Sequence, residues 1–281
     1  MRVLITGAGG QLGRELVDAF TGPSIDVVAA DRATLDVGDR DAVLGAITTL
    51  QPDAVVHAAA WTAVDDCEGD PDRAWRVNAL GSRHVADGAR RVGAHVTYVS
   101  TDYVFDGTKD GPYVEWDQTG PRSAYGRSKL GGERELDPGS TIVRTSWVFG
   151  RHGHNMVKTL LRLAAGDGEV RFVDDQRGCP TAADDLATMV RHLVTARLPG
   201  TFHVTNTGAT TWYDFACDVF AAAGADPARV VPIRTADLDP PRPAPRPANS
   251  VLDNAALRLT GIPLLPDHHE PMGRLVKELT S

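Results

Sequence analysis

The sequence predicts an α/β protein built on a doubly wound parallel sheet, with a smaller, mostly helical second domain. Runs of β-branched residues alternate with helical segments, a pattern typical of parallel sheets covered by helices. A glycine-rich turn at residues 6–13 follows the first run, and a polar turn at residues 100–107 follows a later one. Open α/β sheets bind ligands at the carboxyl ends of their strands, where both turns fall. We therefore expect a nucleotide-binding sheet of the Rossmann type.

Composition sets the class of protein. The chain has 281 residues, of which 42% are hydrophobic and 23% charged, enough for one large or two closely joined domains. A formal net charge of -8 and the lack of a basic run argue against a nucleic-acid partner. No apolar run approaches the ~20 residues of a membrane span. The first strand begins at Arg2 and leaves no room for a signal peptide, and the three cysteines form no Cys-x-x-Cys pair. We expect a cytoplasmic protein with reduced thiols and no membrane partner.

The first strand, residues 2–5, runs directly into a loop with three regularly spaced glycines and then a helix over 11–20. Gly7 permits a tight turn, Gly10 lets a pyrophosphate approach the backbone, and Gly13 allows close packing of helix on strand. The helix N-terminus faces the phosphates. A glycine-rich turn in this position predicts a dinucleotide site that includes Gln11 and Leu12.

The second strand, residues 26–30, ends at Asp31 and Arg32. An acidic side chain there accepts from the adenosine ribose hydroxyls, whereas an arginine accommodates a 2′-phosphate. Having both leaves NADH and NADPH open. A short extended piece ends at Asp36 and Val37, where Asp36 either meets the adenine amino group or belongs to the cap of the helix over 39–50.

A third strand, residues 54–57, is followed by Ala58, Ala59 and Ala60, which are small enough to let a cofactor lie across the strand end. Thr62 and Val64 then begin a loop that we expect to face the substrate. A helix is predicted over 71–92, with Asn78 near its middle.

The candidate catalytic residues follow the next strand, residues 96–100. Thr101 follows at the strand's C-terminal end, and Tyr125 and Lys129 lie four apart on a predicted helix, so they share a face. Carbonyl reduction needs such a set: a phenol to protonate the alkoxide, a cation to lower the phenol pKa, and a hydroxyl to orient the oxygen. We expect Lys129, together with an oxidised nicotinamide, to lower the Tyr125 pKa. A Tyr-x-x-x-Lys pair alone also occurs on exposed helices, so its context decides.

The second half of the chain contains a strand over 140–144 and helices ending near residue 165 and spanning 184–196, 212–223 and 271–281. Residues 201–206 are expected to return as a strand of the main sheet. We divide the chain into a nucleotide domain, 1–150, to which 180–206 return, and a substrate domain, 151–281. Trp212, Phe215 and Phe220 are expected to form the buried face of their helix. The proline-rich stretch 239–247 is either a stiff connector or a strap that carries Arg246 to a substrate diphosphate.

Together the glycine loop, Asn78 and the set Thr101, Tyr125 and Lys129 resemble the extended short-chain dehydrogenases/reductases. Longer phrases resemble the dTDP-4-dehydrorhamnose reductase family within that class: STDYVFDG at 100–107, RTSWVFG at 144–150, DQRGCPT at 175–181, GATTWYDFA at 208–216 and RPANS at 246–250. The resemblance covers essentially the whole chain.

The resemblance implies NAD(P)H-dependent reduction of the C4 ketone of a dTDP-6-deoxy-4-ketohexose, dTDP-4-dehydrorhamnose, to dTDP-L-rhamnose. The catalytic places fall to Thr101, Tyr125 and Lys129, of which Tyr125 and Lys129 also contact the cofactor. The substrate contacts would be Thr62, Val64, Thr101, Asp102, Tyr103, Trp147 and Arg246. Family members often use a divalent ion such as Mg²⁺ at a subunit contact, so the resemblance leaves Mg²⁺ and a homodimer open. The sequence itself shows no metal-ligand set.

Two alternatives remain at this point. A sugar-nucleotide dehydratase or epimerase shares the fold, but the dehydratase places Asp-Glu directly after the threonine, and Tyr103 stands where that glutamate would be. A non-catalytic regulatory subunit on the same scaffold is the other, and the presence of Thr101, Tyr125 and Lys129 argues against it.

Overall fold

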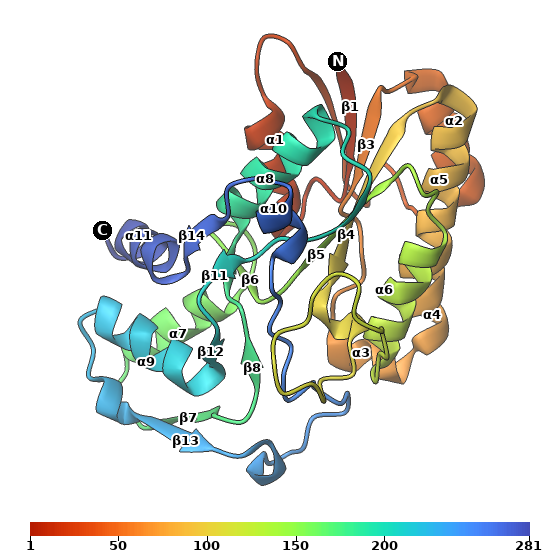
Figure 1. The fold of residues 1–281 in the computed structure, drawn as a ribbon. Helices are drawn as coiled ribbons and strands as arrows, with labels where there is room; N and C mark the ends of the chain where they lie inside the picture. The colour runs from red at the N-terminus through yellow and green to blue at the C-terminus, as the bar shows by residue number, and fades with distance from the viewer.

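The computed structural model describes residues 1–281 and centres on a parallel sheet of six strands (Figure 1). The order is β10-β5-β4-β3-β1-β2. The strands are β1 (Arg2–Thr6), β2 (Asp26–Ala30), β3 (Ala54–His57), β4 (His95–Thr101), β5 (Thr141–Thr145) and β10 (Gly200–His203). After β2 the chain crosses back over β1 to form β3, so the strand order reverses between β1 and β3. This doubly wound arrangement confirms the predicted fold class.

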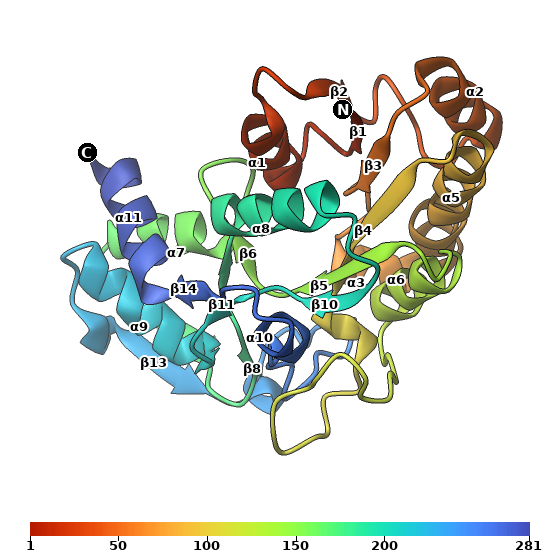
Figure 2. The same ribbon diagram turned by 45° about the horizontal axis from the view of Figure 1, so that its top comes forward.

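Helices cover both faces of the sheet, as Figure 2 shows. On one face lie α1 (Gln11–Phe20) and α8 (Ala183–Thr195); on the other lie α2 (Arg40–Leu50), α5 (Gly81–Val92) and α6 (Ala124–Arg134). Alternate residues of β1 point to opposite faces, so Val3 and Ile5 pack with α1 and α8 while Leu4 packs with α2 and α5. Burial on both faces explains why the strands read as nearly continuous apolar runs.

The helical run over residues 71–92 is not one regular helix. It consists of α4 (Pro71–Trp75), a π-helical turn η1 (Arg76–Leu80) and α5. Before it lies α3 (Val64–Gly69), in a stretch predicted as loop; six residues are too few to show helical periodicity. The π-helical turn carries Asn78, and such turns are common at functional sites.

A second lobe packs beside the carboxyl ends of the strands. Its helices are α7 (Met156–Ala164), α9 (Trp212–Ala222) and α11 (His269–Thr280), with Leu160, Phe215, Phe220 and Met272 in one shared core. Four two-stranded sheets complete the lobe: β6 (Val148–Phe149) with β9 (Thr181–Ala182), β7 (Val170–Val173) with β13 (Val230–Ile233), β8 (Arg177–Gly178) with β12 (Thr210–Thr211), and β11 (Asn206–Thr207) with β14 (Leu265–Asp267). None was predicted, because most of these strands are too short to show alternation.

The chain crosses between the lobes several times. The strand β10 pairs with β5 in the main sheet, and α8 contributes Leu186 and Val190 to the sheet's core. The short helix α10 (Ala255–Leu259) packs on β10, and its Leu257 belongs to that same core. Three single 3₁₀ turns complete the fold: η2 (Asp102–Val104), η3 (Pro227–Arg229) and η4 (Thr235–Asp237). No helix is long and apolar enough to cross a membrane.

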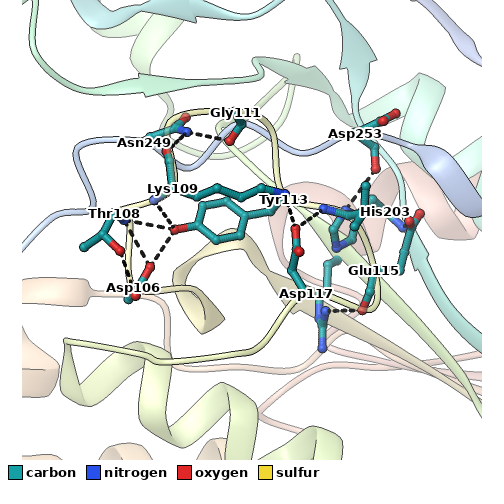
Figure 3. A network of polar contacts seen from close by, with 12 residues as sticks. Asp106, Thr108, Lys109, Gly111, Tyr113, Glu115, Asp117, His203, Asn249 and Asp253 are labelled. Carbon is teal, nitrogen blue, oxygen red and sulfur yellow. Dashed lines mark hydrogen bonds and ion pairs between the residues drawn. The ribbon is translucent and has the colours of Figure 1, made fainter.

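A long loop over residues 105–123 joins η2 to α6 and is tied to the chain around residue 250 (Figure 3). The Tyr113 hydroxyl donates to Asp106 Oδ1 at 2.6 Å and accepts from two backbone amides of the loop. Asn249 Nδ2 donates to the carbonyl oxygens of Lys109 and Gly111 at 2.7 and 2.9 Å. The loop and the segment after the proline-rich stretch therefore form one fixed unit.

Candidate active site

One cavity of about 780 Å³ opens at the carboxyl ends of the parallel strands and extends to the second lobe. Every site residue predicted from the sequence lines it, except Arg246: Gly7, Gly10, Gln11, Leu12, Gly13, Asp31, Arg32, Asp36, Val37, Ala58, Ala59, Ala60, Thr62, Val64, Thr101, Asp102, Tyr103, Tyr125, Lys129 and Trp147. The structure thus brings residues from distant parts of the chain together around a space that can hold a dinucleotide and a sugar nucleotide.

The glycine loop is packed so tightly that side chains cannot be accommodated. A Cβ on Gly13 would lie 2.0 Å from Gly7 O, and one on Gly7 would lie 2.7 Å from the Ala59 backbone. Gly7 also has φ +72, a left-handed conformation that favours glycine. Gly10 caps α1 without a side-chain hydrogen bond, which leaves the helix N-terminus suited to an anion.

The end of β2 carries the groups expected at the adenosine ribose. Asp31 accepts from the amides of Ala33 and Thr34, and the hydrogen bond from the Thr34 amide lowers the Asp31 pKa. Arg32 is exposed, lines the cavity and forms no ion pair. The helix α2 is capped by Asp39, which accepts from the amide of Ala42, so Asp36 is not the capping residue and lines the cavity instead.

The three predicted catalytic residues meet where β4 ends and α6 begins. Thr101 is the last residue of β4; its hydroxyl donates to Asp102 Oδ1 at 2.9 Å and accepts from the Tyr103 amide at 3.2 Å. Tyr125 is the second residue of α6 and is buried. Burial raises the pKa of Tyr125 above its usual range, and the Thr101 hydroxyl beside it acts in the opposite direction.

Lys129 lies one turn after Tyr125 and is 2% exposed. Its Nζ donates to Val99 O at 2.7 Å and lies 4.0 Å from the centroid of the Tyr98 ring. Burial lowers the pKa of Lys129 to about 7, against the opposing effect of Glu133. In the protein alone, desolvation of the phenol is the largest influence on the Tyr125 pKa, and the lowering expected from Lys129 together with an oxidised nicotinamide stays a prediction.

Buried polar groups support this set from behind, and sequence reasoning missed most of them. Glu133 accepts from Nε and Nη2 of Arg144 at 2.9 and 2.7 Å and from Ser100 Oγ at 2.5 Å. Tyr125, Lys129 and Glu133 follow one another at intervals of four on α6, so helical spacing was a signal for Glu133. The ion pair fixes the helix that carries Tyr125 and Lys129, two of the predicted catalytic residues.

Asn78 links the segment after β3, which lines the cavity, to α6 by hydrogen bonds. Its Oδ1 accepts from the Trp61 amide at 2.8 Å, and its Nδ2 donates to Trp61 O and to Ser128 Oγ at 3.1 and 2.9 Å. The side chain is fully buried. Its place in the π-helical turn lets one amide hold both the segment after β3 and α6.

Asp102 is the buried carboxyl of the site. Burial raises its pKa to about 6, although the hydrogen bond that Thr101 donates to its Oδ1 favours the charged form. Its Oδ2 has no hydrogen-bond partner. An unpaired buried oxygen beside Thr101 is suited to a polar group of a substrate.

Trp147 follows β5 and lines the cavity together with Trp212 of α9. The two indole rings stack with centroids 3.6 Å apart and planes 7° apart. Phe215 and Phe220 form the buried face of α9 as predicted, whereas Trp212 is only partly buried because it faces the cavity. Trp147 has φ 47, a backbone conformation that costs a non-glycine residue about 1–3 kcal/mol.

Arg246 lies outside the cavity lining. Its guanidinium pairs with both carboxylate oxygens of Asp65 on α3, at 2.5 and 2.8 Å, and also donates to Ala244 O. Its side chain is 16% exposed. The hydrogen bond from Arg246 is the main cause that lowers the Asp65 pKa. These contacts use three of the five N–H donors of the guanidinium, so Nε–H and one Nη2–H remain for a diphosphate.

Two groups of side chains have metal-ligand spacing, and neither fits Mg²⁺. Glu15 and Asp18 lie near His152, but Arg151 already binds both carboxylates at about 3 Å. The second group, Asp218, His268 and His269, offers two imidazoles, whereas Mg²⁺ prefers oxygen ligands. The structure does not support the Mg²⁺ prediction.

The doubly wound sheet, the glycine loop at its first turn and the Thr–Tyr–Lys set in one cavity define a nicotinamide-dependent oxidoreductase of the short-chain dehydrogenase/reductase class. Comparison with known proteins narrows the class. The family model described as RmlD substrate binding domain matches residues 1–281, and the chain belongs to this family of dTDP-4-dehydrorhamnose reductases.

Individual relatives agree with this assignment. A dTDP-4-dehydrorhamnose reductase of Streptomyces griseus is 45% identical over 270 residues, covering 93% of this chain and 88% of the relative. The structure of a Clostridium acetobutylicum dTDP-4-dehydrorhamnose reductase is 41% identical, with a TM-score of 0.96 over 100% of both chains. That of the Bacillus anthracis enzyme in complex with NADP is 38% identical, with a TM-score of 0.94 over 99% of both chains.

Proposed function

We propose that this protein reduces the C4 ketone of dTDP-4-dehydrorhamnose with NADPH or NADH and releases dTDP-L-rhamnose. The observation that carries the proposal is the single cavity in which Thr101, Tyr125 and Lys129 lie together with the glycine loop. Family membership supplies the substrate class. The site residues supply the chemistry.

When bound, the cofactor supplies a hydride to the ketone carbon. Tyr125 donates its phenolic proton to the oxygen as the C=O bond becomes an alcohol, so one hydride and one proton are consumed. The raised pKa of Tyr125 keeps this proton in place at neutral pH. The Thr101 hydroxyl donates to Asp102 Oδ1 in this structure; on substrate binding it would turn to donate to the same oxygen and orient the carbonyl. Lys129 holds the nicotinamide ribose and stabilises the phenolate after proton transfer.

Both reduced cofactors are proposed to support turnover. Gly7 to Gly13 would hold the pyrophosphate, and Ala58 to Ala60 the region across the strand ends. Asp31 would accept from the ribose hydroxyls of NADH, whereas Arg32, exposed at the cavity, would bind the 2′-phosphate of NADPH. NADP in the Bacillus anthracis relative supports the second contact.

The dehydratase alternative has no base in this structure at the expected position. Tyr103 follows Asp102, and its pKa is raised by burial, so the phenol stays neutral rather than acting as a carboxylate base. The non-catalytic alternative is not favoured by any feature of the cavity. A homodimer and a cytoplasmic location stay predictions.

The test is a turnover assay with purified protein, dTDP-4-dehydrorhamnose, and NADPH or NADH. We expect oxidation of either cofactor that depends on the ketosugar, with dTDP-L-rhamnose identified as the product by NMR. Cofactor binding without oxidation would favour the regulatory alternative. A product epimeric at C4 would keep the substrate and the reductase chemistry but change the face of the ketone that receives the hydride.

A further inference from the structure

The stacked pair of Trp147 and Trp212 joins the two lobes at the cavity that Thr101, Tyr125 and Lys129 also line. Thr101 of β4 pairs in register with Thr145 of β5, so Trp147 lies two residues beyond the strand partner of a catalytic residue. Trp212 begins α9 in the second lobe. Both indoles line the cavity, and their rings are nearly parallel at 3.6 Å.

Trp147 is confined on another side by Gly178. A Cβ at Gly178 would lie 2.4 Å from Trp147 Cε2 and 2.6 Å from its Nε1, so no larger residue fits there. Gly178 pairs with Thr210 in the ladder of β8 and β12, and Thr211 caps α9 by accepting from the Asp214 amide at 3.0 Å. The same ladder therefore places Gly178 and Trp212 against Trp147.

The backbone of Trp147 is also held. Its carbonyl accepts from the Thr181 amide at 3.2 Å, next to the pairing of β6 with β9. Its left-handed φ of 47 is unfavourable for tryptophan and persists only where the surroundings determine it. The surroundings that do so are Trp212 and Gly178.

We propose that Trp212 is a positioning residue: by stacking on Trp147 it fixes the indole wall that receives the hexose ring of the sugar nucleotide. The inference rests on the proposed function. Trp212 covers one face of the Trp147 ring and Gly178 lies against the other, so the hexose meets the edge of this indole wall with its methyl group and C–H bonds. Thymidine and the diphosphate lie farther from Thr101, so their binding does not depend on this wall.

The first measurement concerns position and needs no turnover. In protein labelled with 5-fluorotryptophan, the ¹⁹F resonance of Trp147 should shift in Trp212→Ala, because the ring current of the stacked indole is lost. Trp212→Phe should restore part of the shift, and Trp116→Phe, at a side chain 65% exposed, should leave the Trp147 resonance unmoved. A Trp147 resonance unchanged in Trp212→Ala would overturn the proposal.

The second measurement separates hexose from nucleotide. Trp212→Ala should lower kcat/KM for the sugar nucleotide about three- to tenfold, the range expected for an aromatic pair. The Kd values for dTDP and NADPH should be unchanged, and Trp212→Phe should recover most of the loss. Gly178→Ala, which displaces Trp147 from the other side, should give the same pattern.

Equal losses of dTDP, NADPH and sugar-nucleotide binding in Trp212→Ala would indicate a general packing defect and overturn the proposal. An unaltered kcat/KM would do the same. If the unmodified protein fails to oxidise NADPH with the ketosugar, the proposed function falls instead, and the ¹⁹F measurement still tests whether Trp212 stacks on Trp147.

Discussion

Tyr125 and Lys129 lie one turn apart on α6, and burial shifts their pKa values in opposite directions. Burial favours the neutral form of each, so the Tyr125 pKa rises while the Lys129 pKa falls to about 7. The phenol is therefore a secure proton donor at neutral pH, whereas the ammonium can lose its charge within the physiological range. The two residues should leave different signatures in kinetics.

Tyr125→Phe removes the proton donor and leaves the ring in place. We expect kcat to fall by a factor of roughly 10²–10⁴, the usual contribution of a positioned acid. The Kd for NADPH should change little, and this binding measurement is the control for folding. A kcat near that of the unmodified protein at saturating cofactor would exclude Tyr125 as the donor.

The pH dependence should report Lys129. Because its pKa in the free protein is about 7, the charge is lost as pH rises through that value, and kcat/KM should decline on the alkaline side. Lys129→Arg keeps a permanent charge and should lack this decline, although its absolute rate will be lower. The same alkaline limb in both proteins would assign the titration to another group.

Arg32→Ala should weaken the binding of NADPH but not that of NADH, because only NADPH carries a 2′-phosphate that a guanidinium can bind. The measurement is kcat/KM with each cofactor, and the exposed Arg162 of α7, which forms no ion pair and does not line the cavity, provides a matched control as Arg162→Ala. If kcat/KM in Arg32→Ala falls equally with NADH and NADPH, Arg32 does not contact the 2′-phosphate.

At the scale of elements, the sequence was most informative where periodicity runs long. The helices over 11–20 and 212–222 and the strand over 26–30 lie within one residue of their predicted bounds. The π-helical turn was not predictable, because inserting one residue into a helical turn leaves no compositional mark. Short strands such as β8 and β12 form only through tertiary pairing.

The candidate site was predictable to a similar degree. Residues at strand ends and on one helix face followed from spacing, and all of those line the cavity. Most of the contacts that hold them did not: the Glu133–Arg144 ion pair joins α6 to β5, and the stacking of Trp212 on Trp147 joins segments far apart in the sequence. Sequence spacing reports contacts within one element and not those between elements.

Arg246 connects the proline-rich segment to α3, and its predicted role as a diphosphate ligand can be tested against this contact. Arg246→Ala should raise KM for the sugar nucleotide with little change in kcat. Asp65→Asn should leave KM unchanged or lower it, because it releases the guanidinium for the phosphates.

The double variant makes the test decisive. If Arg246→Ala, Asp65→Asn and the double variant all raise KM equally, the ion pair itself is the functional unit, and the phosphate role is contradicted.

At the scale of the whole molecule, buried histidines couple the fold to pH. His203 ends β10 inside the protein, donates from Nδ1 to Asp253 O at 3.1 Å and has no partner for Nε2. Burial lowers its pKa to about 3. The folded protein therefore keeps His203 neutral where the unfolded chain, with a pKa of 6.5, binds a proton.

The free energy of unfolding should thus decrease as the pH falls from about 6.5 towards 3. Urea denaturation of the unmodified protein and of His203→Gln across this range measures the effect, and the difference between them should shrink with acidification. Asp102 titrates with the opposite sign in both proteins, so it cancels in the difference. A difference that is constant with pH would show that the pKa of His203 is the same in the folded and the unfolded protein, and would contradict this prediction.

The repeated crossing of the chain between the lobes has a consequence for how this family can change over time. The second lobe is assembled from stretches before α8, after β10 and after α10, and the returns between them carry a strand of the main sheet and part of its core. No single gene segment encodes the part that surrounds the sugar. Recombination that exchanged one contiguous block between relatives would split the sheet. New sugar preferences therefore have to arise by separate substitutions around an inherited cofactor-binding sheet.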